Sequence, residues 1–207
     1  MDNKDKIILD LCGGTGSWSK PYKDAGYDVR VITLPWHDVF TYEPPSENVY
    51  GILMAPMCTE FSYAKSGTRD LEKGMLLVKR CMEIMWQVQY KLQIPGARTT
   101  TLKFWALENP YGFLREFLGM PAMIFSPNEF GADYKKRTCI WGNFNIPYKE
   151  LHNANSRKPY ELCELKAEHK PFPEDYEWSK ETLLSKRAAR RSMTSQEFAK
   201  VFFEVNQ

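Results

Sequence analysis

Three short apolar segments of the chain each end in a turn of glycine, proline or polar residues. These segments are residues 7–11 (IILDL), 49–54 (VYGILM) and 102–107 (LKFWAL). The connections between them include helical segments, with apolar residues three and four positions apart. Strands that alternate with helices pair in parallel, and helices then cover both faces of the sheet. The pattern therefore predicts an α/β fold built on a mostly parallel sheet.

The remaining elements follow from periodicity and from their end signals. We expect a helix at 19–25, a strand at 27–33, a helix at 70–92, strands at 123–125 and 138–141, and a helix at 194–205. Gly26 is placed to end the first helix. Thr194 and Glu197 have the spacing of a capping box, which marks the start of the last one.

The length and composition of the chain limit the class of protein. Its 207 residues, 43% of them hydrophobic, suit one domain over 1–207, with a loop-rich, proline-containing segment at 143–186. A net charge of +2 does not by itself indicate a polyanionic partner. No apolar run approaches the ~20 residues of a membrane span, and a strand follows the N-terminus directly. We therefore expect a cytoplasmic protein without a signal peptide.

The cysteines and histidines give no metal-binding pattern. Five cysteines are spread along the chain without a Cys-x-x-Cys pair, which disfavours a disulfide framework and a compact zinc site. Cys163 and His169 make half a metal site, and the sequence offers no second half. We expect a reduced protein that holds no metal.

The first apolar segment continues into the turn Asp10-Leu-Cys-Gly-Gly-Thr-Gly16. Glycines after a first strand let a ligand approach the backbone, and the N–H groups of the following helix are available to it. The acidic residue distinguishes this turn from phosphate-binding loops, because a carboxylate can accept a hydrogen bond from a ligand's amino group. The alternative is a tight strand–helix connection without a ligand.

The second segment continues into APMCTEFS, which places Pro56 and Cys58 just beyond a strand. Open α/β folds bind their ligands at this edge of the sheet. A thiol in that position acts as a nucleophile when its pKa is lowered or when it is shielded from bulk water. The alternative is an inert cysteine in a loop.

The third segment continues into Glu108-Asn-Pro, and a basic turn, Lys135-Lys-Arg137, precedes a later strand. A carboxyl group held by a proline turn can exchange a proton with a bound ring, and the cations can neutralise a phosphate. The alternatives are a surface glutamate and a solvated basic turn. Because the carboxyl ends of parallel strands meet at one edge, we expect these turns to face one crevice.

The ordered motifs ILDLCGGTGSWS, APMCTEFS, ENPYG and DYKKRTCIWGNF resemble those of the C5-cytosine DNA methyltransferases, and most closely the short phage and prophage forms. The resemblance covers roughly residues 7–144 and the terminal helix. It implies a Rossmann-like methyltransferase fold, S-adenosylmethionine (SAM) as cofactor and DNA as substrate, in a bacterial or phage-infected cell.

The resemblance also implies catalytic roles. Cys58 would add to C6 of cytosine while Glu108 donates a proton to N3, which activates C5 for methylation. The base would be flipped out of a duplex or already single-stranded. Lys135 and Arg137 fit the basic position of the family and would contact the flipped base or a nearby phosphate.

For the cofactor, the resemblance implies contacts by Asp10, Gly14, Gly16, Asp38 and Pro56. The family's usual aromatic residue after Asp-Leu is a cysteine here. An adenine-stacking partner is then missing unless Trp18 supplies it.

The family's target-recognition region is shortened to about 45 residues, too few for a full domain. Arg187, Arg190 and Arg191 would fall on one face of a helix and grip phosphates, with a solvated helix start as the alternative. Three further alternatives stay open: a free pyrimidine nucleotide or another DNA modification as the reaction, a non-catalytic SAM- or DNA-binding protein, and a separate recognition partner.

Overall fold

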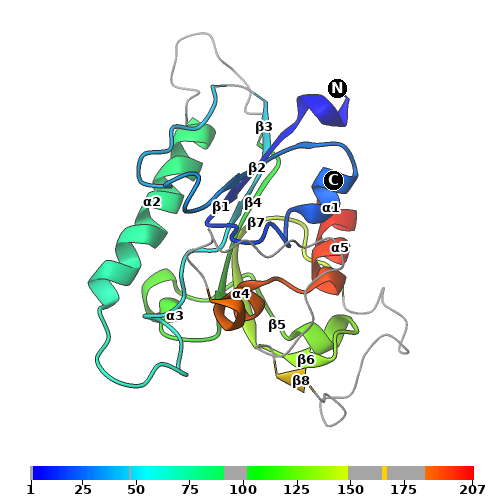
Figure 1. Cartoon of the computed structure of the whole chain (residues 1–207). Coiled ribbons are helices and arrows are strands. Elements are labelled where there is room, and N and C mark those ends of the chain that lie inside the picture. The colour runs from blue at the N-terminus through cyan, green and yellow to red at the C-terminus, as the bar shows by residue number, and fades with distance from the viewer. Residues whose placement is uncertain (1, 47, 91–101, 149–164, 167–184) are drawn as a thin grey trace.

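The computed structural model of the protein describes residues 2–46, 48–90, 102–148, 165–166 and 185–207 (Figure 1). Its main sheet has six strands in the order β2-β1-β3-β4-β7-β5. They are β1 (Ile7–Leu11), β2 (Asp28–Ile32), β3 (Val49–Met54), β4 (Phe104–Pro110), β5 (Met123–Phe125) and β7 (Thr138–Asn143). β1 pairs in parallel with β2 and β3, and β3 with β4, whereas β7 runs antiparallel to β4 and β5. The expected α/β, Rossmann-like fold is confirmed.

Helices cover both faces of the sheet, with α2 on one side and α1 and α5 on the other (Figure 1). The helices are α1 (Lys20–Asp24), α2 (Leu71–Tyr90), α3 (Leu114–Leu118), α4 (Lys186–Ser192) and α5 (Gln196–Val205). The described residues also include two 3-10 turns, η1 (Asn3–Asp5) and η3 (Pro127–Phe130). β6 (Tyr134–Lys135) pairs in parallel with β8 (Leu165–Lys166) as a small second sheet.

The alternation of side chains along β1 explains the two layers. Ile7, Leu9 and Leu11 belong to the core cluster that includes the buried face of α2. Ile8 belongs to the opposite cluster, which contains the aromatic residues of α1 and α5. Because successive residues of a strand point to opposite faces, Asp10 faces the same layer as Ile8. The Asp10 carboxylate is therefore buried on the side of the sheet that has the aromatic core.

Three details differ from the sequence-based expectations. β4 continues through Glu108 to Pro110, because Glu108 pairs with Ile140 of the antiparallel strand, so the carboxylate sits in a strand and not on a turn. The cap of α5 is Ser195, whose side chain accepts from Phe198 N, so the proposed capping box at Thr194 is wrong.

The third detail concerns the loop-rich segment 143–186. Its residues 165–166 form β8, while 149–164 and 167–184 lie outside the described residues, together with the half-site at Cys163 and His169. No helix within the described ranges is long and apolar enough to cross a membrane.

Candidate active site

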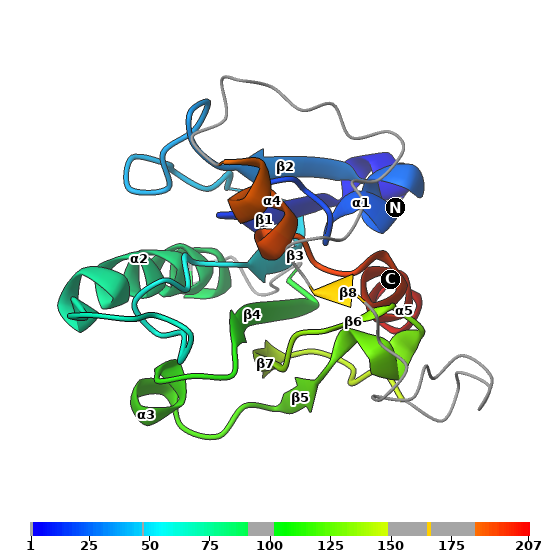
Figure 2. The ribbon, with the colours of Figure 1, turned by 60° about the horizontal axis from the view of Figure 1, so that its bottom comes forward.

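The carboxyl ends of β1, β3 and β4 meet at one edge of the sheet. Leu11 pairs with Met54, where β1 and β3 end, and Met54 pairs with Leu107, beyond which β4 continues to Pro110. The glycine turn and the Cys58 turn therefore begin at adjacent strand ends, and Glu108 lies on the next strand at the same edge. Figure 2 shows α4 in front of this edge, near β1 and β3. That these segments form a binding crevice stays a prediction.

The Cys58 turn is fastened to the end of β4. The Asn109 side chain, fully buried, donates through Nδ2 to the carbonyl of Pro56 at 2.9 Å. Ser62 forms a backbone bridge with Gly112, where a Cβ atom would collide with the carbonyl oxygen of Phe61. Only glycine allows the two backbone segments to approach so closely. The nucleophile turn and the Glu108 strand are thus one unit.

A second set of contacts closes the loop that follows Cys58. The Glu60 carboxylate accepts from Lys65 Nζ at 2.5 Å and from the backbone N–H of Asp70 at 2.7 Å. These bonds lower the pKa of Glu60, the one from Lys65 most. The Arg69 guanidinium donates to the carbonyls of Glu60, Ser62 and Lys65. The loop is held by side chains from within it.

The electrostatics of Cys58 place it beside the predicted acid. Burial raises the pKa of the Cys58 thiol, and the Glu108 charge raises it further, whereas Lys136 and Arg191 lower it. The Lys136 ammonium lies 3.3 Å from Glu108 Oε1, and both side chains are mostly buried. The structure therefore brings together a thiol, a carboxylate and an ammonium in one partly desolvated place.

The turn after β1 contains a buried carboxylate that is only half satisfied. Asp10 is fully buried, accepts from Ser19 Oγ at 2.5 Å through Oδ2, and has no partner for Oδ1. Burial raises its pKa to about 7, against the bond from Ser19, which lowers it. A Cβ atom at Gly13 would collide with this carboxylate. An orphaned oxygen beneath a glycine turn fits a ligand that carries an amino group.

Helix α4 connects the two sides of the site. Ser192, at its end, is the nearest residue to the space above Gly14, and the backbone N–H of Thr194 donates to Ser17 Oγ at 2.9 Å. Arg191 acts electrostatically on Cys58, as described above. The C-terminal part of the chain is therefore anchored over both the glycine turn and the nucleophile.

Trp18 does not lie where the sequence expectation needs it. Its indole is 2% exposed and packs edge-on against Phe202 at 5.4 Å and against Phe198 of α5. An indole inside the core offers no face to an adenine ring, so this part of the prediction is wrong. The Cys12 sulfur lies 3.8 Å from that of Cys81 in α2.

The other predicted cofactor residues are near the same edge. Gly14 and Gly16 have φ values of 57° and 67°, a conformation that glycine adopts freely. Asp38 is exposed, and its carboxylate accepts from the backbone N–H of Phe40 at 2.9 Å. Their roles in binding a cofactor stay predictions.

The basic turn contributes a different residue from the two that were predicted. Lys136, not Lys135 or Arg137, contacts Glu108. Arg137 instead lies over the ring of Tyr111, and Lys135 is part of β6. Lys136 and Asn109 are the functional candidates that sequence reasoning missed. The sequence did contain a signal for them: Lys136 lies between the two predicted cations, and Asn109 follows the predicted acid Glu108.

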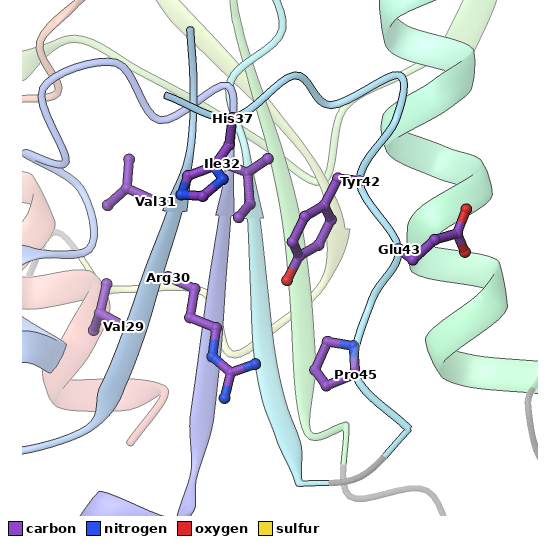
Figure 3. Close-up of a pocket in the computed structure, with 8 residues that line it drawn as sticks. All are labelled: Val29, Arg30, Val31, Ile32, His37, Tyr42, Glu43 and Pro45. Atoms are coloured by element: carbon purple, nitrogen blue, oxygen red, sulfur yellow. The ribbon is translucent and has the colours of Figure 1, made fainter. Parts of the chain in front are cut away.

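A pocket of about 440 Å³ lies along β2, away from Cys58 (Figure 3). Its lining comes from the strand and from the segment after it: Val29, Arg30, Val31, Ile32, His37, Tyr42, Glu43 and Pro45. It contains neither the thiol nor the glycine turn, so we do not assign the methyl-transfer chemistry to it. The pocket does border the turn that carries Asp38.

Comparisons with known proteins find only a weak structural similarity. No family model and no curated protein matches the chain. Among solved structures the chain is similar to a DNMT2 variant from Spodoptera frugiperda, with 16% identity and a TM-score of 0.38 over 78% of this chain and 54% of that one. The chain thus spans about half of that protein. In the described part of the chain, no three His, Cys, Asp or Glu side chains are placed to hold a metal.

Proposed function

We propose that the protein is a SAM-dependent methyltransferase that methylates C5 of cytosine in DNA through a covalent Cys58 adduct. One observation carries the proposal: Cys58, Glu108 and Lys136 act on one another at the carboxyl edge of the sheet. Covalent activation of an electron-poor ring needs this combination of a nucleophile and an acid.

The residues would divide the work as follows. Cys58 Sγ, as thiolate, bonds to C6 while Glu108 gives its proton to N3, so that electron density collects at C5. Lys136 stabilises the carboxylate that Glu108 leaves behind. After methylation, C5 loses its proton to a solvent base, the bond from C6 to Cys58 breaks, and N3 returns its proton to Glu108. Cys58 then leaves as the thiolate in which it entered the reaction.

The glycine turn would hold SAM, whose ammonium group fits the unpartnered oxygen of Asp10. When bound, SAM supplies an electrophilic methyl group. Gly14 and Gly16 leave room above the turn, and Pro56 fixes the backbone between cofactor and base. Asp38 is assigned to the adenosine end, beside the pocket along β2.

DNA is the proposed substrate, with short or little sequence preference. Arg191 lies near Cys58 and, with Arg187 and Arg190, makes α4 basic at the entrance to the site. Contacts of this kind grip phosphates without reading bases. We propose one catalytic domain over 1–207, in which 143–186 replaces a recognition domain or receives a separate partner.

The shortened recognition segment favours one other substrate, a free pyrimidine nucleotide. Methyl-labelled SAM should be incubated with the protein and either mixed-sequence oligonucleotides or dCMP, followed by digestion and identification of the labelled nucleoside. We expect 5-methyl-deoxycytidine from the oligonucleotides. Labelling of dCMP alone would select the nucleotide reaction, and label that is not on C5 would select another modification.

Cys58→Ala should abolish the labelling, with Cys139→Ala as the matched loss of a different, buried thiol. SAM binding by calorimetry should survive in both variants. Unchanged labelling by Cys58→Ala would refute the proposed mechanism. SAM and DNA binding without any turnover in the wild type would make the protein a non-catalytic binder.

A further inference from the structure

We propose that Cys12 and Cys81 are a redox pair, and that a disulfide bond between them closes the glycine turn to its cofactor. Cys12 follows β1 at the start of the glycine turn, and Cys81 lies within α2. Neither thiol has a part in the proposed methyl transfer. The effect on the cofactor rests on the proposed function, whereas the formation of the disulfide does not.

The two sulfur atoms are already in contact. Cys12 Sγ and Cys81 Sγ are 3.8 Å apart, and a disulfide bond is about 2.0 Å long. The sulfurs must therefore approach each other by about 1.8 Å, which requires a rotation of the side chains and a small shift of the turn. The residues are 69 positions apart in the chain, so the sequence gave no sign of this pair.

Cys12 has a backbone conformation that does not favour a side chain. Its φ is 58°, in the left-handed region that glycine adopts freely and most other residues avoid. A glycine at this position would form the same turn with less strain. The thiol is therefore what cysteine adds here, and its sulfur contacts Cys81.

The exposure of the two thiols sets the order in which they react. Cys12 is partly exposed, whereas Cys81 is fully buried. The hydrogen bond with Cys12 and then burial raise the pKa of the Cys81 thiol, which keeps this thiol protonated and unreactive toward a soluble oxidant. A peroxide therefore oxidises Cys12 first, and Cys81 resolves the product.

The oxidant in this scheme is a peroxide, and no other reactant is needed. The Cys12 thiolate attacks one oxygen of hydrogen peroxide and the O–O bond breaks, which gives a sulfenic acid and hydroxide. The hydroxide takes up the proton that Cys12 had released and becomes water. The Cys81 sulfur then attacks the Cys12 sulfur, the S–O bond breaks, and the hydroxyl group leaves with the Cys81 proton as a second water. A dithiol reverses the disulfide by thiol–disulfide exchange.

Cys12 lies where a shift would reach the proposed ammonium site. Its backbone N–H donates to the carbonyl of Ile32 at the end of β2, at 2.8 Å. Gly13, the next residue, packs so closely on the Asp10 carboxylate that a Cβ atom would collide with it. Movement of Cys12 toward α2 therefore displaces the turn relative to the unpartnered Asp10 oxygen. Because that oxygen is assigned to the ammonium group of SAM, the disulfide should weaken SAM binding.

Helix α2 connects the redox pair to the other end of the proposed cofactor site. Arg80, the neighbour of Cys81, donates to the carbonyls of Val39 at 3.1 Å and Tyr42 at 2.7 Å. These carbonyls belong to the segment that follows Asp38, which is assigned to the adenosine end. A shift of α2 at Cys81 therefore acts on both ends of the cofactor site.

The first test asks whether the bond forms, and its result does not depend on the function. It uses Cys58→Ala protein, so that the Cys58 thiol cannot compete for the oxidant. The folded protein is treated with hydrogen peroxide, its free thiols are blocked, and its non-reduced peptides are analysed by mass spectrometry. We expect Cys12 joined to Cys81, and separation of the two by dithiothreitol. Peptides without this cross-link would overturn the redox pair.

The second test measures SAM binding by calorimetry in the same background. Oxidation should weaken binding at least about tenfold, because a charge-assisted hydrogen bond to Asp10 is lost, and dithiothreitol should restore it. Cys81→Ala and Cys12→Gly should each bind SAM as the reduced protein does and should not respond to peroxide. Glycine suits the φ value of position 12. Cys139→Ala, which removes a different buried thiol, should stay sensitive.

Two results would overturn the closing of the glycine turn. One is cross-linked protein that binds SAM as tightly as reduced protein. The other is sensitivity to peroxide that persists in both Cys81→Ala and Cys12→Gly, because another thiol would then cause it. Methylation of DNA by the reduced wild type would show in either case that the proposed function stands. Reduced protein that binds no SAM would overturn both the proposed function and the closing of the turn, and the first test alone would then decide the redox pair.

Discussion

The turns after β1 and β3 lie at adjacent strand ends but differ in how completely their polar groups are satisfied. After β3, the Pro56 carbonyl, the Ser62 backbone and the Glu60 carboxylate all have partners within the loop or on β4. After β1, the buried Asp10 carboxylate keeps one oxygen without a partner and has a raised pKa.

This difference indicates two ways of preparing a site. The nucleophile turn is ordered before any substrate binds. Cys58 is therefore held near Glu108 without a further loss of conformational entropy on binding. The glycine turn retains an unfavourable burial that a cationic ligand group would relieve. In the proposed reaction, the substrate side is rigid and the cofactor side is completed by its ligand.

Glu108→Gln should have the largest effect on the nucleophile side. Removing the proposed acid should slow methyl transfer by about 100-fold to 10,000-fold, the usual contribution of general acid catalysis. Single-turnover rates with labelled SAM measure this, with the exposed Glu72→Gln as the control. SAM affinity should not change. A rate within threefold of the wild type would separate Glu108 from the chemistry.

Asp10 tests the cofactor side through the pH dependence of stability. The unfolded chain ionises Asp10 near 3.8 and the folded protein near 7, so the unfolded state binds fewer protons between these values. The free energy of unfolding should therefore fall as pH rises through this window, by about 3–4 kcal/mol from this group. Urea denaturation at pH 4, 6 and 8 measures it.

Asp10→Asn removes this contribution and serves as the reference, because all other titrating groups are shared. The difference between wild type and variant should shift in favour of the variant as pH rises. A difference that is constant with pH would show that Asp10 is ionised in the folded protein, and the contrast between the two turns would disappear.

Gly112→Ala should loosen the nucleophile turn. The new methyl group meets the Phe61 carbonyl, and we expect a loss of about 1–3 kcal/mol in stability together with slower methyl transfer. Gly67→Ala is the matched control, because Gly67 has φ of 86° but open space around it. It should lower stability without slowing the reaction. Equal effects on rate would show that the bridge does not position Cys58.

The smallest effect concerns the reactivity of Cys58. Lys136 lowers and Glu108 raises the pKa of its thiol, so Lys136→Met should slow alkylation by iodoacetamide and Glu108→Gln should accelerate it, each about threefold. Mass spectrometry of the Cys58 peptide separates it from the other cysteines. Changes of the same sign would contradict the proposed arrangement of charges.

The sequence predicted the positions of the strands well because the apolar segments are followed closely by glycine or proline, although β4 continues beyond its apolar segment to Pro110. It also predicted that Cys58 and Glu108 lie at one edge of the sheet, since parallel strands share that edge. The choice among three consecutive basic residues was not predictable, because it depends on the backbone path between β6 and β7. Trp18 was misplaced because α5, far along the chain, covers it.

The central claim is that Cys58 forms a covalent bond to a cytosine in DNA. The most direct measurement incubates the protein and SAM with an oligonucleotide that contains 5-fluorocytosine, and separates the products on a denaturing gel. Fluorine at C5 cannot leave as a proton does, so the adduct persists. We expect a shifted band in the wild type and none in Cys58→Ala. A wild type that methylates ordinary cytosine but forms no adduct, or an adduct that survives in the variant, would contradict it.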